Sequence, residues 1–309
     1  MKSAISKDQK NEKPAAHNNL ALSYFENHNF EEALLHYGKA IQIEPSAVHY
    51  NNRGLAYFHC DKLDEARSDF DTALKYNPND PTIYFNRGNV YLNWSPEPEF
   101  EKAHEDYNIA LSIAPNNPKL WHSKGLAFQA EGELKQKNNN IVDMELYKCA
   151  IEMYLKALEV QENFMSSRFH LGLMYHKTNR FTDALKCFSR VLVKVKDDKT
   201  IYIARGVVYQ DMGNHQLAIE DFNEAINLAP ELSEGYFRRG FSYYYQKRFE
   251  LAIEDFKTAQ KKELELAEQD DLVFEKNNGI EDGLGCCFHE LRNFEEAIHH
   301  FDLAIERDP

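Results

Sequence analysis

Small and aromatic residues recur along this chain with a period of about 34 residues. The small members of the pattern are Ala21, Gly54, Gly88, Gly125, Gly172, Gly206, Gly240 and Gly285. An aromatic residue follows each of them three positions later, at Tyr24, Tyr57, Tyr91, Phe128, Tyr175, Tyr209, Tyr243 and Phe288. Because a step of three or four keeps side chains on one helical face, the pattern predicts a helix around each pair.

A second helix is predicted in every period. Its alanines are Ala33, Ala66, Ala103, Ala150, Ala184, Ala218, Ala252 and Ala297, and its aromatics are Tyr37, Phe70, Tyr107, Tyr154, Phe188, Phe222, Phe256 and Phe301. Five periods close with a proline, which cannot continue a helix interior, at Pro45, Pro78, Pro115, Pro230 and Pro309. Each period is therefore an antiparallel pair, helix A then helix B, and stacking of the pairs supplies the core.

These columns resemble the tetratricopeptide repeat (TPR) family, over eight repeats in residues 14–309. The departures are few: Ala21 replaces glycine, Val191 replaces an alanine, and repeats 4, 5 and 7 lack the closing proline. The resemblance implies an all-α fold, a right-handed superhelical α-solenoid of antiparallel helix pairs whose A helices line a concave surface. We expect a disordered tail at 1–13 and one array with repeats at 14–46, 47–80, 81–117, 118–164, 165–198, 199–232, 233–277 and 278–309.

Three repeats are longer than the period. Repeat 3 has two extra prolines after Trp94, which predict a stiff loop where Trp94 is either exposed or packed on its own repeat. Repeat 4 has about thirteen extra residues, and we expect both its helices to lengthen into a projecting hairpin that turns at 138–140. Helix B of repeat 7 is expected to overrun through 261–275 until Asn277, Asn278 and Gly279 break it.

The array stops at Pro309 with no further polar helix. Repeat arrays need a terminal unit with a polar outer face. We therefore expect either a truncated chain or an end covered by a partner or by a second copy, which leaves self-association through this end open.

Charge and composition argue against some classes of binding partner. The net charge is −14 without a basic cluster, which argues against nucleic acid and anionic membranes. No apolar run is long enough to cross a bilayer, and the N-terminus lacks the apolar stretch of a secretory signal. Five scattered cysteines favour free thiols in a reducing compartment. We expect a cytoplasmic protein, with a cytoskeletal or ciliary location as the alternative.

Signals for catalysis, metals and cofactors are absent from the sequence. It has no glycine-rich phosphate loop, no CxxC and no HExxH. His299 and His300 are neighbours on a helix and point in different directions, so they make a poor ligand pair. Acidic pairs such as Glu220–Asp221 and Glu254–Asp255 have the spacing of solvated helix faces. We predict no enzyme activity, no metal and no cofactor.

Chaperone-binding members of the family hold a C-terminal carboxylate with a five-residue clamp of Lys, Asn and Arg on three adjacent A helices. Of that pattern, repeats 1–3 keep Asn52, repeats 2–4 keep Asn86 and Lys119, and repeats 5–7 keep Arg238. Without clustered cations a terminal carboxylate would lose its hydration uncompensated. A chaperone tail is therefore not an expected ligand.

Other members grip peptide backbones with a ladder of asparagines. The ladder positions of repeats 1–3 here are Asn19, Asn52 and Asn86, and Asn89 would extend the polar strip. An asparagine amide both donates and accepts hydrogen bonds, so it can pair with a peptide group of any sequence. We expect either an extended-peptide groove in repeats 1–3 or merely solvated and capping asparagines.

Repeat 7 carries a second candidate surface, made of Phe237, Arg238, Phe241, Tyr244 and Tyr245. Aromatic residues beside arginine are enriched at the energetic centres of protein interfaces. The alternative is that Phe237 and Phe241 pack between neighbouring A helices. Tyr244 and Tyr245 are the members that we expect to be exposed.

These patterns together predict a non-enzymatic scaffold or adaptor that binds a peptide or helix of a partner protein in its concave groove. The alternative is a structural subunit of a large ciliary or cytoskeletal assembly. Such a subunit would be held through its outer faces, its insertions and its bare C-terminal end.

Overall fold

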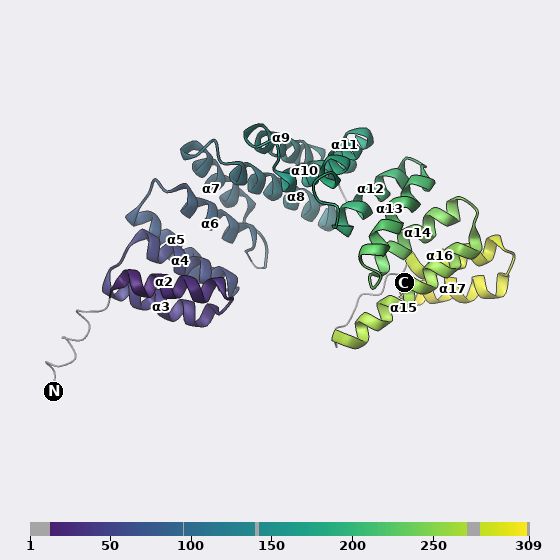
Figure 1. Ribbon diagram of the computed structural model, residues 1–309, viewed down its shortest axis with the longest axis horizontal. Helices are drawn as coiled ribbons and strands as arrows, with labels where there is room; N and C mark the ends of the chain where they lie inside the picture. Colours follow the sequence, from purple (N-terminus) through teal and green to yellow (C-terminus); the bar gives the residue numbers. More distant parts are fainter. Residues whose placement is uncertain (1–12, 95, 140–141, 271–278, 308–309) are drawn as a thin grey trace. The chain divides into compact units, whose positions relative to one another are not determined.

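The computed structural model describes residues 13–94, 96–139, 142–270 and 279–307, which form sixteen α-helices and no strand. The chain divides into two compact units, Met1–Phe164 and Met165–Pro309. Within each unit the helices stack as four consecutive antiparallel pairs (Figure 1). The predicted all-α solenoid is thus confirmed, and a single array running through both units stays a prediction. Most of the predicted N-terminal tail lies outside the described residues.

Every repeat contains one A helix and one B helix. In the first unit the A helices are α2 (Pro14–Glu26), α4 (Ala47–His59), α6 (Pro81–Leu92) and α8 (Pro118–Asn139). The B helices there are α3 (Phe30–Ile43), α5 (Leu63–Tyr76), α7 (Phe100–Ile113) and α9 (Met144–Val160). In the second unit the A helices are α10 (Met165–Lys177), α12 (Lys199–Asp211), α14 (Ser233–Tyr245) and α16 (Gly279–Glu290). Their B helices are α11 (Phe181–Leu192), α13 (His215–Leu228), α15 (Phe249–Asp270) and α17 (Phe294–Arg307).

The B-helix aromatics form the centre of each repeat. Their side chains are almost completely buried at Tyr37, Phe70, Tyr107, Tyr154, Phe188, Phe222 and Phe256. Each ring lies against the small residue of its own A helix, as Phe256 lies against Gly240. A Cβ atom built on Gly240 would stand 2.9 Å from that ring, so glycine permits the close approach of the two helices. Packing of this kind explains why the two sequence columns repeat together.

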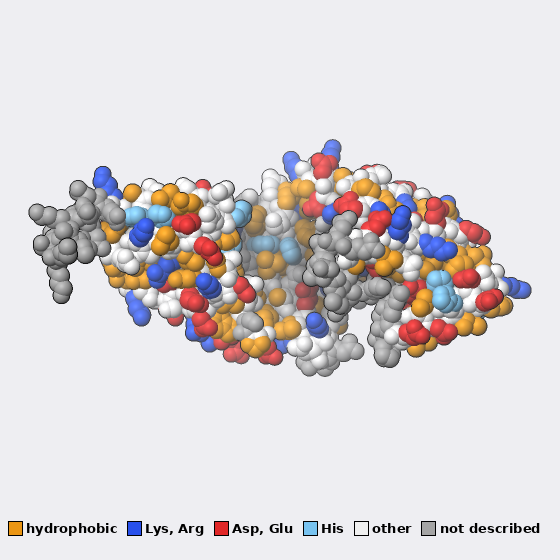
Figure 2. All heavy atoms as spheres, turned by 90° about the horizontal axis from the view of Figure 1, so that it is seen from below, with side chains coloured by type: hydrophobic (Ala, Val, Ile, Leu, Met, Phe, Trp, Pro, Cys, Tyr) orange, Lys and Arg blue, Asp and Glu red, His pale blue; other side chains and the backbone are white. Residues whose placement is uncertain are grey.

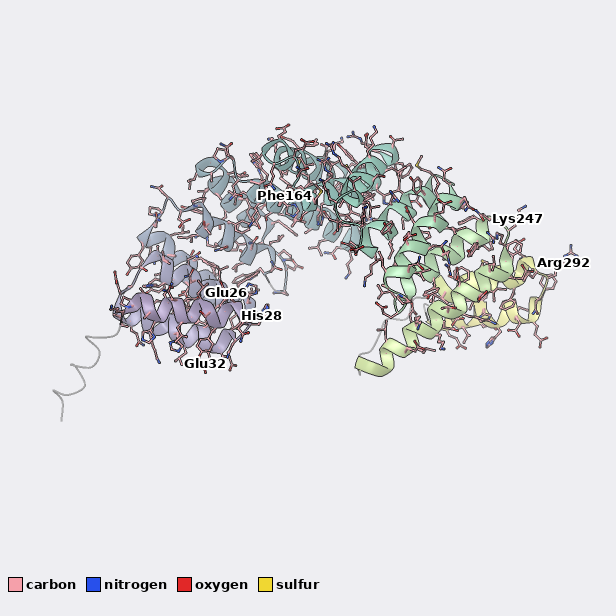
Figure 3. The ribbon with its side chains drawn as sticks, in the orientation of Figure 1. Glu26, His28, Glu32, Phe164, Lys247 and Arg292 are labelled. Carbon is pink, nitrogen blue, oxygen red and sulfur yellow. The ribbon has the colours of Figure 1, made fainter. Side chains whose placement is uncertain are left out.

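Most turns from helix A to helix B share one backbone conformation. A residue with positive φ ends the A helix at His28, Asp61, Asn179, Gly213, Lys247 and Arg292. Figure 3 labels three of these turn residues, His28, Lys247 and Arg292. The next N–H then donates back to the A-helix aromatic, as Arg248 N does to the Tyr243 carbonyl over 2.9 Å. This helix ending satisfies carbonyls that would otherwise lack a partner and fixes where the B helix begins.

Repeat 4 carries the expected lengthened hairpin. α8 has 22 residues, whereas the other A helices have 12 or 13. α9 has 17 residues, whereas the B helices of the other repeats except repeat 7 have 12 or 14. The added turns repeat the packing of the first ones: Tyr154 lies against Gly125 and donates to Gln129, while Tyr147 lies against Gly132 and donates to Gln136. The extension is therefore a packed continuation of the helix pair. The predicted turn at 138–140 begins too early, because residues 138 and 139 still belong to α8, and residue 140 lies outside the described residues.

The other two insertions differ from each other. α15 continues to Asp270, as the expected overrun requires, residues 271–278 lie outside the described residues, and Gly279 of the predicted break begins α16. Trp94 is half-buried, with the Arg67 guanidinium 4.7 Å above its ring and Tyr91 beside it. Trp94 is therefore packed and not exposed, but it packs against Arg67 of repeat 2 as well as against Tyr91 of its own repeat.

In the described parts of the chain, four repeats contain a buried Arg–Asp ion pair between their two helices. The pairs are Arg53–Asp69, Arg87–Asp106, Arg205–Asp221 and Arg239–Asp255, each with two N–O distances between 2.6 and 2.8 Å. The four carboxylates are at most 5% exposed. Predicting Asp221 and Asp255 on solvated faces was therefore wrong. In each pair the aspartate comes directly before the buried aromatic residue of helix B. The arginine that it contacts comes directly before the small residue of helix A.

The same arginines also connect consecutive repeats. Arg239 donates from Nη1 to Asn223 on the preceding B helix over 2.6 Å, and Arg205 reaches Ser189 in the same way over 3.2 Å. Arg87 forms the equivalent contact as an ion pair with Asp71 over 2.6 Å. Each of these guanidinium groups thus joins helix A, its own helix B and the previous repeat.

The last helix has an exposed apolar stripe. Phe294, Ile298 and Ile305 of α17 are each more than half exposed. In four other repeats the residue equivalent to Ile305 is buried, at Ile41, Leu111, Leu192 and Ile226. Ile226, for example, lies against Gly235 of the next A helix. The surface that a following repeat covers elsewhere is thus exposed on α17.

Candidate protein-binding sites

A hollow of about 490 Å³ opens in the second unit between the end of α12, the turn to α13 and the length of α14. Its lining residues are Gln210, Asp211, Gly213, His215, Phe237, Arg238, Phe241 and Tyr245. Four of the five residues predicted for the repeat-7 surface are among them. We call this hollow the aromatic pocket.

Two phenylalanines form the deep wall of the aromatic pocket. Phe237 and Phe241 meet edge to face, with ring centroids 5.0 Å apart, and Phe241 makes a similar contact with the buried Phe256. Both rings are therefore held by the core and also face the pocket. The packing is against Phe256 of the B helix, and a role of these two rings in binding a partner stays a prediction.

Tyr245 forms the outer wall. It is 60% exposed, which confirms the expected exposure, and its ring stacks on that of His215 with centroids 5.0 Å apart and planes 9° apart. Burial lowers the pKa of His215, so its imidazole is mainly neutral at physiological pH. The two flat rings thus present an aromatic surface at low conformational cost to a partner.

Tyr244 does not belong to the pocket. Its ring is half-buried against the core that includes Leu284 and Cys287 of α16. Burial, together with Cys286 and Glu290 on α16, raises the pKa of Tyr244. Expecting both tyrosines to be exposed was wrong because consecutive helical residues differ by about 100° in direction. Tyr245 therefore turns toward the end of α12 while Tyr244 turns toward the next repeat.

Some polar groups of the pocket already form hydrogen bonds or ion pairs within the chain. Arg238 donates from Nε to Glu234 over 2.9 Å, and its two Nη atoms have no partner among the described residues. Asp211 lies 2.6 Å from His176 Nε2. Gln210 donates to the Ser242 hydroxyl and to the Arg238 carbonyl, which ties α12 to α14. The pocket thus offers an open guanidinium edge beside aromatic walls.

The sequence did not reveal the contribution of α12 and its turn. Gln210, Asp211 and His215 lie in repeat 6, one repeat before the predicted surface, and no motif marks them. The repeat register is the signal that could have found them. It places the end of each A helix beside the A helix of the next repeat.

In the first unit the asparagines bond to one another. Asn86 Nδ2 donates to Asn51 over 2.9 Å, Asn51 to Asn52 over 3.4 Å, and Asn52 to Asn18 over 3.1 Å. Asn86 is also buried, at 5% exposed. Asn19 is exposed and is not part of this chain of amides, in which Asn18 takes its place. Gripping of a peptide by Asn19, Asn52 and Asn86 stays a prediction, with several of the required hydrogen bonds already formed internally.

Asn89 has a structural partner. Its Oδ1 accepts a hydrogen bond from the Tyr107 hydroxyl over 2.7 Å, and Tyr107 is buried. This amide therefore serves the packing of repeat 3 and does not extend an open polar strip. Repeats with phenylalanine at the position of Tyr107 have an apolar residue or cysteine at the position of Asn89, such as Leu55 beside Phe70.

We expect Asn89→Leu to lower the free energy of unfolding by about 1–3 kcal/mol, since the Tyr107 hydroxyl would be buried without an acceptor. Adding Tyr107→Phe should restore much of the loss. Urea unfolding of the two single variants and the double variant measures this coupling. Additive losses would show that the hydrogen bond is unimportant.

The described parts of the chain do not meet the requirements of a metal site, a membrane-spanning helix or a reactive thiol. No three His, Cys, Asp or Glu residues gather there to hold a metal ion. None of the described helices has the length and apolar character needed to cross a bilayer. Cys187 and Cys287 are buried, which raises the pKa of their thiols to about 11 and about 12 and makes them poor nucleophiles. On the face shown in Figure 2, acidic and basic side chains are interspersed over each unit.

Comparison with known structures supports this architecture. A tetratricopeptide repeat protein from Parabacteroides merdae is 21% identical with a TM-score of 0.59, and the match covers 89% of this chain and 98% of that one. PilW, described as a type IV pilus biogenesis factor, is 18% identical with a TM-score of 0.62, over 72% and 97% of the two chains. PilF of Pseudomonas aeruginosa is 16% identical with a TM-score of 0.59, over 72% and 94%. At these identities the likeness concerns the fold.

No curated protein matches the chain by sequence. Family models do match it, under the descriptions "TPR repeat" at residues 54–93 and "Tetratricopeptide repeat" at residues 14–46, 200–232, 233–264 and 283–309. These segments come from both compact units, and those at 14–46 and 200–232 each span one stacked helix pair. The chain therefore belongs to the tetratricopeptide repeat family.

Proposed function

We propose that this chain is a non-catalytic scaffold that binds a segment of a partner protein on the A-helix surface of its second unit. In this proposal the aromatic pocket receives a large apolar side chain of the partner. The TPR fold suggests protein–protein interaction in general, and the pocket supplies a specific place for it.

The observation that carries the proposal is the composition of the pocket. Phe237, Phe241 and Tyr245 supply aromatic walls, while Arg238 supplies an open guanidinium edge. Aromatic residues and arginine are the types enriched at the energetic centres of interfaces. The deep wall is held by the buried Phe256, so binding needs little ordering of the receptor.

We expect Tyr245→Ala to weaken partner binding by at least about 2 kcal/mol, because the variant removes the outer wall of the pocket. The measurement is affinity purification with the tagged full chain from an extract of its source cells, with the retained proteins quantified by mass spectrometry. Proteins that wild type enriches should be lost with Tyr245→Ala.

Tyr76→Ala is the matched control. Tyr76 is 54% exposed and stacks on another ring, Tyr50, but it lies in repeat 2, which contributes no lining residue to the aromatic pocket. This variant should retain the wild-type set of proteins. Equal retention by both variants would overturn the assignment of the pocket as the binding site.

A second candidate function, self-association as part of a larger assembly, is favoured by the exposed stripe of α17. Its equivalent in other repeats is the repeat-to-repeat interface, so we assign a second copy of the chain as the occupant. Sedimentation velocity should then give a dimer for the wild type and a monomer for Ile298→Asp with Ile305→Asp. A wild-type monomer at micromolar concentration would rule out this candidate.

A further inference from the structure

The second unit contains another hollow, of about 280 Å³, on the opposite flank of α12 from the aromatic pocket. Its lining residues are Met165, Ser166, Phe169, His170, Val191, Val195, Asp198, Thr200 and Ile201. They come from the first half of α10, the end of α11 with the segment after it, and the start of α12. We call this hollow the aliphatic pocket.

The two pockets occupy matching positions of the repeat. Phe169 and His170 in the aliphatic pocket precede Phe237 and Arg238 in the aromatic pocket by two full repeats. The corresponding position of the repeat between them holds Ala204, a small residue. Equivalent positions of α10 and α14 therefore contribute to both pockets.

The repeat sets the distance between the pockets. Phe169 lines one pocket and Phe237 the other, at equivalent positions of α10 and α14, and α12 lies between these two helices. Neighbouring packed helices lie about 8–10 Å apart, and two such steps separate α10 from α14. Their separation is therefore about 18 Å, which an extended chain covers in five or six residues.

The linings select different side chains. The smaller aliphatic pocket has Phe169 and His170 on one side, and its other apolar walls are branched or flexible, at Val191, Val195, Ile201 and Met165, which suit an aliphatic side chain. The larger aromatic pocket has aromatic walls, which suit an aromatic side chain in edge-to-face contact. The two Nη atoms of Arg238, without a partner in the described residues, match the two oxygens of a carboxylate.

We propose that the second unit recognises an extended segment with an aliphatic and an aromatic anchor five or six positions apart, and with a carboxylate next to the aromatic anchor. This inference rests on the proposed function and specifies its partner. The aliphatic anchor enters the aliphatic pocket, the aromatic anchor enters the aromatic pocket, and the carboxylate pairs with Arg238.

The test uses a phage-displayed library of random twelve-residue peptides selected on the immobilised full chain. We expect selected peptides to share the two anchors at this spacing, with Asp or Glu beside the aromatic anchor. The carboxylate can come from a side chain or from the peptide's own C-terminus, so the leading peptide is resynthesised with its acidic residue changed to amide and, separately, with an amidated C-terminus. Loss of affinity in only one of these two forms identifies the source.

Two receptor variants separate the anchors. Val195→Asp places a charge in the aliphatic pocket, and Tyr245→Ala opens the aromatic one; both residues are exposed, and melting temperatures check that the variants remain folded. Each variant should weaken the leading peptide about tenfold or more in calorimetric titration. A peptide whose aliphatic anchor is changed to alanine should no longer respond to Val195→Asp but should still respond to Tyr245→Ala.

The outcomes distinguish this inference from the proposed function. If selected peptides respond to Tyr245→Ala but never to Val195→Asp, the two-anchor model is wrong and the aromatic pocket stands as the binding site. If selected peptides respond to neither variant, both the inference and the proposed function are overturned. Anchors at a variable spacing would also contradict the two-anchor model.

Discussion

Replacing Arg239 with alanine should lower the free energy of unfolding by about 3–5 kcal/mol, because it leaves the Asp255 carboxylate buried without its partner. Asp255 is 4% exposed, and both its oxygens accept hydrogen bonds from Arg239, at 2.8 and 2.7 Å. The variant also breaks the contact of Arg239 with Asn223 on the preceding repeat. Repeats 6 and 7 would thus lose packing together.

The neighbouring residue supplies the control. Arg238 lies on the pocket wall, and its ion pair with Glu234 is partly exposed on both sides. Exposed pairs of this kind contribute at most about 1 kcal/mol. Arg238→Ala should therefore leave stability nearly unchanged while weakening the selected peptides.

Urea unfolding followed by circular dichroism measures both variants. A second comparison removes the charge together with its partner: Arg239→Met with Asp255→Leu should recover much of the loss, because no unpaired ion remains. A loss below about 1 kcal/mol for Arg239→Ala would contradict the role assigned to the buried pairs.

Replacing Phe256 with alanine should also cost about 3–5 kcal/mol, through lost burial and an incompletely filled cavity. Its ring is completely buried and packs between two A helices, against Gly240 of its own repeat and Gly283 of the next. Phe237 and Phe241 both rest on it. The deep wall of the aromatic pocket should therefore loosen as well, with a loss of peptide affinity.

Tyr76→Ala is the comparison for this variant. Tyr76 is an aromatic residue of similar size on α5, but it is 54% exposed. Its replacement should change the free energy of unfolding by less than about 1 kcal/mol. Similar losses for the two variants in urea unfolding would show that Phe256 does not hold repeats 7 and 8 together.

The sequence predicted the repeats because their packing is local and recurrent. A small residue on helix A must face an aromatic residue on helix B, as at Gly125 and Tyr154, and this pairing recurs at a fixed spacing. In the structure the lengthened hairpin obeys the same rule, since Gly132 and Tyr147 repeat the pair two turns further along. Such contacts depend on residue type and spacing, which a single sequence contains.

The buried ion pairs were missed for a physical reason. A hydropathy pattern places Asp221 and Asp255 on the solvated surface, because burying a carboxylate costs free energy unless a cation lies in contact with it. The partner arginines lie on another helix, sixteen residues earlier in the chain. The recurrence of arginine before the small residue and of aspartate before the B-helix aromatic was the available signal.

The candidate site was predicted in part. Helical spacing placed Phe237, Arg238, Phe241 and Tyr245 on one surface, but it could not separate Tyr245 from Tyr244. That difference depends on the exact turn of α14 against its two neighbours. The walls supplied by α12 and His215 depend on how repeats stack, which the pattern within one repeat does not contain.

The central claim, that the aromatic pocket receives the aromatic anchor of a partner, is tested most directly by photocrosslinking. A benzophenone amino acid replaces Tyr245 in one variant and Tyr76 in another, each is irradiated with the leading selected peptide, and the linked residues are mapped by mass spectrometry. The account predicts crosslinks from position 245 that centre on the aromatic anchor and are competed by unmodified peptide, with none from position 76. Efficient crosslinking from position 76, or from position 245 to sites scattered along the peptide, would contradict it.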